Sequence, residues 1–145
     1  MTQPDIYVPP GGPPRVAPPN PAIYAAMGQD NIFRMMADFY DELEQSEIRA
    51  MFPKDMAAAS EKSAAFFVGL LGGPPLYHQL YGSPMMRARH MPFPIDEEAR
   101  QVWLACFEAV LADAPAKYNL PAEHLQGFRH FLQEFSRWMV NKRSD

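Results

Sequence analysis

The chain has 145 residues, of which 48% are hydrophobic and 12% aromatic, so it can form one domain with a substantial core. Its net charge of −4 disfavours nucleic acid as a partner, because phosphate binding requires a basic surface. The single cysteine, Cys106, excludes an internal disulfide and a cysteine metal cluster. No apolar run approaches the roughly 20 residues of a membrane span, and no secretory signal is visible, so we expect a cytoplasmic protein without a membrane anchor.

Residues 1–21 are rich in proline and contain Gly11 and Gly12. Proline favours extended backbone, and the segment has too few apolar side chains to form a core. We therefore predict a flexible or loosely draped extension at residues 1–21, followed by one folded domain at residues 22–145. A docking peptide for a partner protein is the alternative interpretation of the same segment.

Apolar side chains recur at helical spacing through the rest of the chain, which predicts an all-α fold. The first such pattern predicts a helix that begins at Asn31, with Asp30 as its N-cap. A second helix is predicted from about Asp55 to Leu71. The sequence Gly-Gly-Pro-Pro at residues 72–75 ends this helix, because glycine can form a C-cap and proline cannot continue a helix.

The second half of the chain predicts shorter elements and then two long helices. A helical or irregular piece at residues 76–82 precedes a brief helix that Ser83 and Pro84 are expected to begin. Asp96 is the predicted N-cap of the next helix, and acidic residues follow it in the first turn, as the helix dipole favours. The last helix is predicted from about Pro121 to Val140. Its apolar stripe belongs to the core or to a homodimer contact, so both a monomer and a homodimer are possible.

His90 is the histidine with unusual surroundings. Met91 precedes Pro92 and is forced out of helical geometry, so His90 lies in the last turn of the brief helix. Phe93 and Ile95 follow between prolines and form a rigid apolar wall beside the imidazole. Because neutral imidazole is a common metal ligand, His90 is either a ligand or a structural histidine. We expect the other histidines at or near the surface, and their spacing does not indicate a zinc site: His78, His124 and His130.

Two aromatic side chains and one thiol complete the set of candidates. Tyr40 and Trp103 each lie on the apolar face of a predicted helix, and each has one polar atom that needs a hydrogen-bond partner when buried. Taken alone, both are compatible with ordinary core residues. Cys106 lies on the same helix as Trp103, and a buried, unreactive thiol is the favoured interpretation over a nucleophile.

Four segments of the sequence resemble the truncated haemoglobins, specifically those of the second group. In chain order they are ADFYDEL, MFPKD, FFVGLLGGPPLY and MRARHMPFPIDEEARQVWLACF. The likeness covers about residues 22–140, and its most specific parts are GGPPLY and RARHMPFPI with the tryptophan that follows. The resemblance implies a globin-like, two-over-two helical sandwich around haem b. It also implies that oxygen, carbon monoxide and nitric oxide are the ligands.

The same resemblance implies roles for particular residues. His90 matches the proximal ligand of the haem iron, and Tyr40 and Trp103 match the distal hydrogen-bond donors. Ser63 occupies a position where relatives carry a bulkier apolar side chain, so it adds a hydroxyl group to the distal side. The implied partners of the haem propionates are Lys62 and Arg89. The implied walls of the haem pocket are Phe52, Ala59, Phe67, Tyr77, Phe93, Ile95 and Phe107.

Two distal donors imply slow oxygen release. Each charge-assisted hydrogen bond contributes ~1.5–3 kcal/mol, so two slow release by roughly two orders of magnitude or more. Slow release is unsuited to bulk oxygen transport and favours sensing, or detoxification of nitric oxide or peroxide. Tyr40 and Trp103 would then be catalytic, and an external reductase would supply electrons, because the chain has no flavin or nicotinamide motif. A haem-free helical interaction protein is the alternative function.

Overall fold

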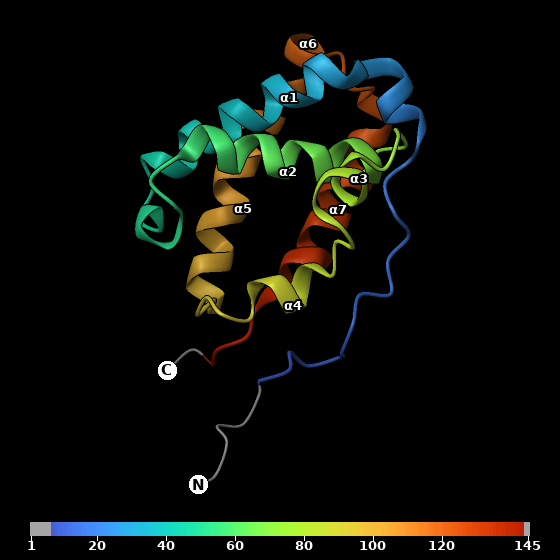
Figure 1. Cartoon of the computed structure of the whole chain (residues 1–145). Helices are drawn as coiled ribbons and strands as arrows, with labels where there is room; N and C mark the ends of the chain where they lie inside the picture. The colour runs from blue at the N-terminus through green and yellow to red at the C-terminus, as the bar shows by residue number, and fades with distance from the viewer. Residues whose placement is uncertain (1–6, 144–145) are drawn as a thin grey trace, which may run out of the picture.

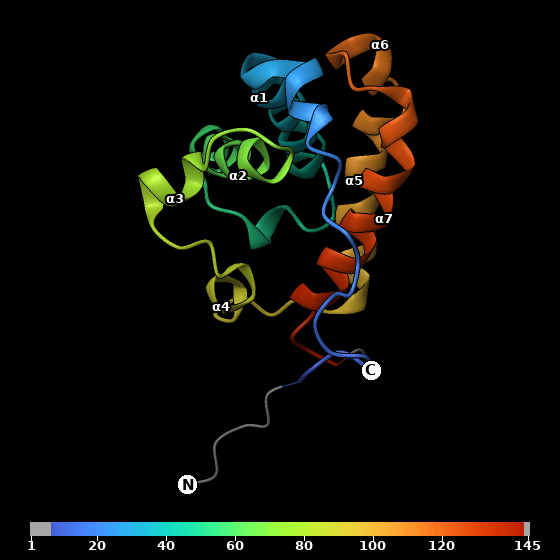
Figure 2. The ribbon, with the colours of Figure 1, turned by 90° about the vertical axis from the view of Figure 1, so that its right-hand side faces the viewer.

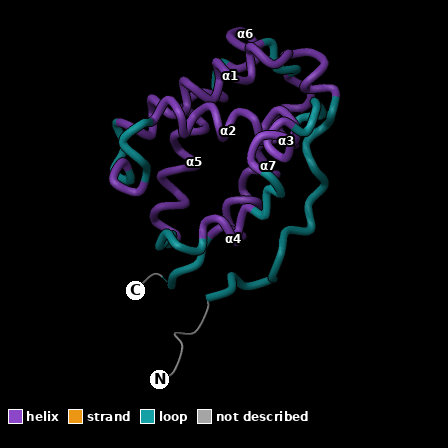
Figure 3. Tube along the Cα trace, in the orientation of Figure 1, coloured by secondary structure: helices purple, strands orange, loops and turns teal. Residues whose placement is uncertain are grey.

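The computed structural model describes residues 7–143, and all regular elements in this part of the chain are helices (Figure 1, Figure 3). Helices α1 (Ala22–Glu44) and α2 (Met56–Leu70) lie side by side as one layer. Helices α5 (Glu97–Leu111) and α7 (Ala122–Met139) form the second layer and cross the first (Figure 2). This is the two-over-two arrangement that the family resemblance implies. The shorter helices are η1 (Arg49–Met51), α3 (Leu76–Tyr81), α4 (Met86–His90) and α6 (Ala114–Tyr118).

Helix α1 begins earlier than the apolar pattern predicts. The element joins two helices across a kink: the second starts just after Gly28, close to the predicted start at Asn31, whereas the first, from Ala22, was not predicted and Asp30 is not the N-cap. The kink lies at Gly28, whose φ of 76° is a conformation that favours glycine. The first turns form because Ile23, which is fully buried, anchors them to the core. The apolar pattern did not predict this first helical segment, because the kink at Gly28 changes which side chains share a helix face.

The predicted N-cap at Asp96 is present in the structure, and Asp55, which was predicted only as a helix start, is a second side-chain cap. The carboxylate of Asp55 accepts a hydrogen bond from the backbone N–H of Ala58 at 3.0 Å, at the start of α2. The carboxylate of Asp96 accepts one from the N–H of Ala99 at 2.9 Å, at the start of α5. Each satisfies a backbone donor that has no partner within its own helix.

The predicted start of the brief helix at Ser83 and Pro84 is wrong. Helix α4 begins at Met86, and the residue before it, Met85, adopts a left-handed conformation with φ of 36°. The carbonyl of Ser83 accepts hydrogen bonds from Arg89 instead, so the loop folds back along the helix. The contact between loop and helix outweighs the capping preference of a serine followed by proline.

The core between the two layers is built from aromatic rings of four helices. Phe39 of α1 and Phe107 of α5 have ring centroids 4.2 Å apart. Phe67 of α2 and Phe128 of α7 pack around Phe107, with centroids 5.5 Å and 5.8 Å from it. Because rings of this size dominate core energetics, the cluster fixes the relative positions of the four long helices.

The extended N-terminal segment lies against the helical domain. Residues 7–21 run from the start of α1 past α7 toward α4 (Figure 1, Figure 2). Pro9 and Pro19 are buried in this path. The first six residues of the predicted extension lie outside the described residues. None of the described helices has the length and apolar character needed to cross a membrane.

Candidate functional site

A cavity of about 640 Å³ opens between α1, α2, the α3–α4 segment, α5 and α7. Its volume lies within the range of about 300–1,000 Å³ that is usual for small-molecule sites. Nearly all the residues predicted from the sequence to form a site line this one cavity. They are Tyr40, Phe52, Ala59, Lys62, Ser63, Phe67, Tyr77, Arg89, His90, Phe93, Ile95 and Trp103.

Phe107 is the predicted pocket residue that the structure places elsewhere. Its side chain is 1% exposed and is not part of the cavity lining. It packs behind the wall, with its ring centroid 5.3 Å from that of Trp103 and 5.5 Å from that of Phe67. Phe107 therefore supports the two rings that face the cavity.

The backbone of α4 orients the imidazole of His90. The His90 Nδ1 atom lies 2.6 Å from the carbonyl oxygen of Met86, one turn earlier in the helix. Since a carbonyl can only accept, Nδ1 carries the proton and donates it. This tautomer leaves the lone pair of Nε2 available to a ligand, which is the usual arrangement of a metal-binding histidine.

The C-terminal tail holds the backbone around His90. The Asn141 side-chain amide donates to the carbonyl of His90 at 3.1 Å and to that of Phe93 at 2.9 Å. Its oxygen accepts a hydrogen bond from the N–H of Ile95 at 2.9 Å. Asn141 was not identified from the sequence, because a single asparagine near a chain end carries no local signal of such a contact.

Tyr40 brings a buried hydroxyl group to the opposite side of the cavity. Its Oη atom lies 2.5 Å from the Ser63 Oγ atom of α2. Burial raises the pKa of the Tyr40 hydroxyl, and the hydrogen bond with Ser63 offsets part of that rise. The phenol therefore stays protonated at neutral pH and can act as a hydrogen-bond donor.

Trp103 provides a second donor from α5. Its ring packs edge-on against Phe39, with centroids 5.5 Å apart, and this contact fixes its orientation. The indole ring lines the cavity, and within the described part of the chain its N–H has no protein acceptor. An indole N–H can only donate, so a ligand with an acceptor atom would satisfy it.

Two cations lie at the rim of the cavity. The Arg89 guanidinium donates to the carbonyls of Tyr81 and Ser83 at 2.9 Å and 2.8 Å, and these bonds fix its position. The Lys62 ammonium lies 5.2 Å from the centroid of the Tyr81 ring. Both basic side chains are exposed, so they could pair with anionic groups at the edge of a bound molecule.

Comparison with known proteins shows the family of the chain. Residues 22–141 match the Bacterial-like globin family. The chain is 34% identical over 122 residues to Group 2 truncated hemoglobin YjbI of Bacillus subtilis (strain 168), covering 83% of this chain and 89% of that protein. The chain belongs to the group II truncated haemoglobins. Members of the globin family bind diatomic gases at a haem.

Solved structures show the same fold. Phosphate-bound Hell's gate globin IV has a TM-score of 0.83 and 34% identity, covering 91% of this chain and 82% of that chain. The truncated oxygen-avid haemoglobin from Bacillus subtilis has a TM-score of 0.75 and 32% identity, covering 84% of this chain and 99% of that chain. Both are similar to this truncated haemoglobin over most of its length.

The residues around the cavity of this truncated haemoglobin suit a haem. The cavity walls are mainly apolar and aromatic, as a porphyrin face requires. One imidazole, whose Nδ1 bonds the Met86 carbonyl, lies in the wall, and two cations stand at the rim where carboxylates could reach them. Each of these features corresponds to one chemical part of the group: the ring, the iron and the propionates.

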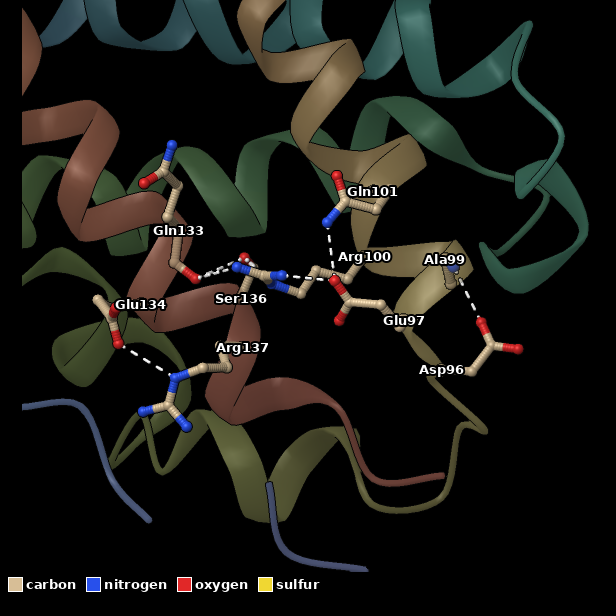
Figure 4. Close-up of polar contacts among 9 residues, drawn as sticks. All are labelled: Asp96, Glu97, Ala99, Arg100, Gln101, Gln133, Glu134, Ser136 and Arg137. Carbon is tan, nitrogen blue, oxygen red and sulfur yellow. Dashed lines mark hydrogen bonds and ion pairs between the residues drawn. The ribbon is translucent and has the colours of Figure 1, made fainter. Parts of the chain in front are cut away.

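A further polar network, which the sequence did not indicate, closes the wall between α5 and α7. Arg100 lines the cavity and donates from Nε to the Ser136 hydroxyl at 3.1 Å and from Nη2 to the Gln133 carbonyl at 2.8 Å (Figure 4). Its Nη1 atom pairs with the Glu97 carboxylate at 2.6 Å. The network joins the two helices beside the cavity across a wide sequence separation, so no local motif reveals it.

The remaining candidates lie away from the cavity. His78 and His130 are exposed, as predicted, and His124 is half-buried. No group of three or more metal-ligating side chains occurs among the described residues. Cys106 is buried, and burial raises the pKa of its thiol, which agrees with the predicted unreactive role.

Proposed function

We propose that this truncated haemoglobin binds haem b through His90 and holds oxygen, carbon monoxide or nitric oxide with hydrogen bonds from Tyr40 and Trp103. The observation that carries the proposal is that the imidazole, the phenol hydroxyl and the indole line one apolar cavity. The haem iron, when bound, supplies the gas-binding and electron-transfer chemistry. The protein supplies the position and polarity of the groups around it.

His90 would hold the haem iron through Nε2. The hydrogen bond from Nδ1 to the Met86 carbonyl holds the tautomer and increases the basicity of the ring. Lys62 and Arg89, at the rim, would pair with the propionates. Phe93 and Ile95 line the cavity with apolar surface and would exclude water from the bound group.

Tyr40 and Trp103 act as donors to the bound gas. Burial keeps the Tyr40 hydroxyl protonated, and the surrounding rings lower the local dielectric, which strengthens each hydrogen bond. At ~1.5–3 kcal/mol each, the two donors slow oxygen release by roughly two orders of magnitude or more. The similarity to a Bacillus subtilis protein described as oxygen-avid supports this role.

Retention of oxygen favours redox chemistry over bulk transport. Conversion of nitric oxide, oxygen and one electron to nitrate is a reaction that a retained oxygen would serve. The electron would come from an external reductase, since the chain has no flavin or nicotinamide motif. Peroxide turnover with an electron donor would use the same residues, and a role in gas sensing would use the same retention.

The ligand role of His90 can be tested by spectroscopy. The wild-type protein should show a Soret band that shifts on reduction with dithionite and again with carbon monoxide. His90→Gly should lose haem and regain it when imidazole is added, because free imidazole can replace the missing ligand. His130→Gly removes an exposed histidine from α7 and is the matched control. A His90→Gly protein that retains haem like the wild type would contradict the assignment.

The redox role needs a separate measurement. The oxygenated protein, supplied with a flavin-dependent reductase and NADPH, should consume nitric oxide and form nitrate faster than an equal concentration of free haemin. A rate no higher than that of haemin would contradict the nitric oxide reaction and leave gas binding intact. Absence of a Soret band in wild-type protein, even after haemin is added, would instead favour a haem-free interaction protein.

A further inference from the structure

Arg87 connects the helix that carries His90 to both ends of the described chain. Its guanidinium donates to the carbonyl of Tyr7 at 2.6 Å and to the carbonyl of Val140 at 2.9 Å, and it also donates to the carbonyl of Trp138. The same group lies 4.4 Å from the centroid of the Trp138 ring. Three carbonyls and one aromatic face therefore surround a single side chain of α4.

Asn141 holds the other side of the same short helix. Its side chain bonds the backbone of His90, Phe93 and Ile95, and its own N–H donates to the Ile95 carbonyl at 2.9 Å. The next N–H, from Lys142, donates to the same carbonyl at 3.1 Å. The tail that follows α7 is therefore fixed to the loop that follows α4.

The N-terminal arm is itself fixed where it meets this tail. Arg137 of α7 donates to the Pro10 carbonyl at 2.7 Å and to the Gly12 carbonyl at 3.0 Å. Pro9 is buried between these contacts and the contact of Arg87 with Tyr7. Residues 7–12 thus lie across the end of α7 and reach α4.

We propose that Arg87 and Asn141 are positioning residues for His90, and that residues 7–12 form a strap that braces α4 against the C-terminal tail. The inference rests on the proposed ligand role of His90. Helix α4 has five residues and none is fully buried, so propensity and core packing contribute little to its orientation. Apart from the bonds of Arg89 to the preceding loop, the hydrogen bonds that constrain it come from the two chain ends. Arginine is required because only its planar fork can reach several carbonyls at once.

Arg87→Lys and Asn141→Ala in the full-length haem-bound protein test the positioning role. Arg129→Lys is the matched control, because Arg129 also forms a bidentate contact, to Glu108 on the α5–α7 face, and lies outside the cavity lining. The readouts are haem transfer to apomyoglobin, the iron–histidine stretching band of the reduced protein, and hydrogen exchange at residues 86–90.

We expect Arg87→Lys and Asn141→Ala each to accelerate haem transfer by about tenfold, to shift or broaden the stretching band, and to increase exchange in α4. Arg129→Lys should leave all three near the wild-type values. Unchanged haem transfer and an unchanged band in both variants would overturn the positioning role. If the wild-type protein lacked an iron–histidine band, the ligand assignment of His90 would fail instead, so the two failures are distinguishable.

Arg137→Ala tests the strap, because this change frees residues 7–12 without touching α4. Exchange at residues 7–12 should rise, and exchange at residues 86–90 and haem transfer should rise with it by a smaller factor than in Arg87→Lys. Increased hydrogen exchange at residues 7–12 alone, with exchange in α4 and haem transfer unchanged, would contradict the proposed strap.

Discussion

The cavity has two walls that are held by different kinds of contact. The distal wall, which carries Tyr40 and Trp103, comes from α1, α2 and α5, which are long helices with buried faces. The proximal wall, which carries His90, comes from α4, a helix of five residues that buries none of them. Packing therefore fixes the distal wall, whereas hydrogen bonds, from the chain ends and from Arg89 to the preceding loop, fix the proximal wall.

This difference separates two properties of the protein. Aromatic packing involves many weak contacts, so loss of one polar atom in the distal wall leaves the wall in place. A proximal contact is one of a few directional bonds, so its loss releases the helix that bears His90, the proposed iron ligand. Distal substitutions should change how long a gas stays bound, and proximal substitutions should change how long the haem stays bound.

The largest expected effect on stability comes from Gly72. This residue follows α2 and lies against Pro21, just before α1, so it holds together two helices that form the cavity. Its φ is +109°, and a Cβ atom there would lie 2.4 Å from the Pro21 carbonyl oxygen. Gly72→Ala should lower the free energy of unfolding by about 2–5 kcal/mol, from backbone strain and overpacking together. Urea unfolding of the haem-bound protein measures the change.

Gly127→Ala is the matched control for Gly72→Ala. Gly127 lies inside α7, and a Cβ atom added there meets nothing within 4 Å. Replacing a helical glycine by alanine should stabilise the protein by about 0.5–1 kcal/mol. Equal stability of the two variants would show that the contact between Gly72 and Pro21 relaxes without cost, and that it does not hold α1 and α2 together.

Trp103→Phe is the sharpest test of the distal wall. The substitution keeps an aromatic ring and removes the indole N–H, so oxygen release should accelerate by about 10- to 100-fold. Haem transfer to apomyoglobin should stay near the wild-type rate. Stopped-flow displacement of oxygen by carbon monoxide measures release.

The other tryptophan offers the reciprocal test. Trp138 stacks on Arg87 beside the proximal wall, at 4.4 Å from guanidinium to ring centroid. Trp138→Phe weakens that cation–π contact, so haem transfer should accelerate modestly while oxygen release changes little. If Trp103→Phe accelerated haem loss and Trp138→Phe accelerated oxygen release, the assignment of separate properties to the two walls would be wrong.

Tyr118 tests a region that belongs to neither wall. Its hydroxyl, on α6, donates to the Asp38 carboxylate of α1. Burial, followed by the bond to Asp38, raises the pKa of Tyr118 well above the ordinary value of 10.0. An unfolded tyrosine ionises near pH 10, so the stabilisation is present below that pH and is lost as pH rises toward the folded pKa.

Tyr118→Phe should therefore lower the free energy of unfolding by about 1 kcal/mol at neutral pH and make its decline above pH 10 less steep. Part of the decline should remain, because the pKa of the buried Tyr40 is also raised. Unfolding measured from pH 7 to 11 gives both quantities. Oxygen release and haem transfer at pH 7 should not change, and a change in either would mean that α6 is coupled to the cavity.

The two walls also differ in how far the sequence could predict them. Helical periodicity identified the buried faces of α5 and α7, and the predicted cap at Asp96 forms with a residue three positions away. The family motifs identified Tyr40 and Trp103, which line the cavity as the resemblance implies. Signals of this kind are local, or they are carried by contiguous motifs, so a single sequence displays them.

The supports of the proximal wall could not be predicted, because they join distant parts of the chain. Asn141 bonds Ile95 across 46 positions, and Arg87 bonds Tyr7 across 80. Ser83 is a residue type that often caps helices, yet it does not cap α4, and its carbonyl accepts a hydrogen bond from Arg89. Such contacts depend on the positions of the chain ends in the folded protein, which the residue spacing within α4 cannot predict.

The smallest expected effect concerns Ser63, whose Oγ atom lies 2.5 Å from Tyr40 Oη. If Ser63 donates and Tyr40 accepts, the phenol proton stays free for the gas and the chain of hydrogen bonds strengthens it. Ser63→Ala should then accelerate oxygen release by about two- to tenfold, as loss of a neutral hydrogen bond predicts. The same change in a Tyr40→Phe background should have no effect, which a double-mutant cycle measures. Slower release in Ser63→Ala would reverse the assignment, because Ser63 would then compete with the gas for the phenol proton.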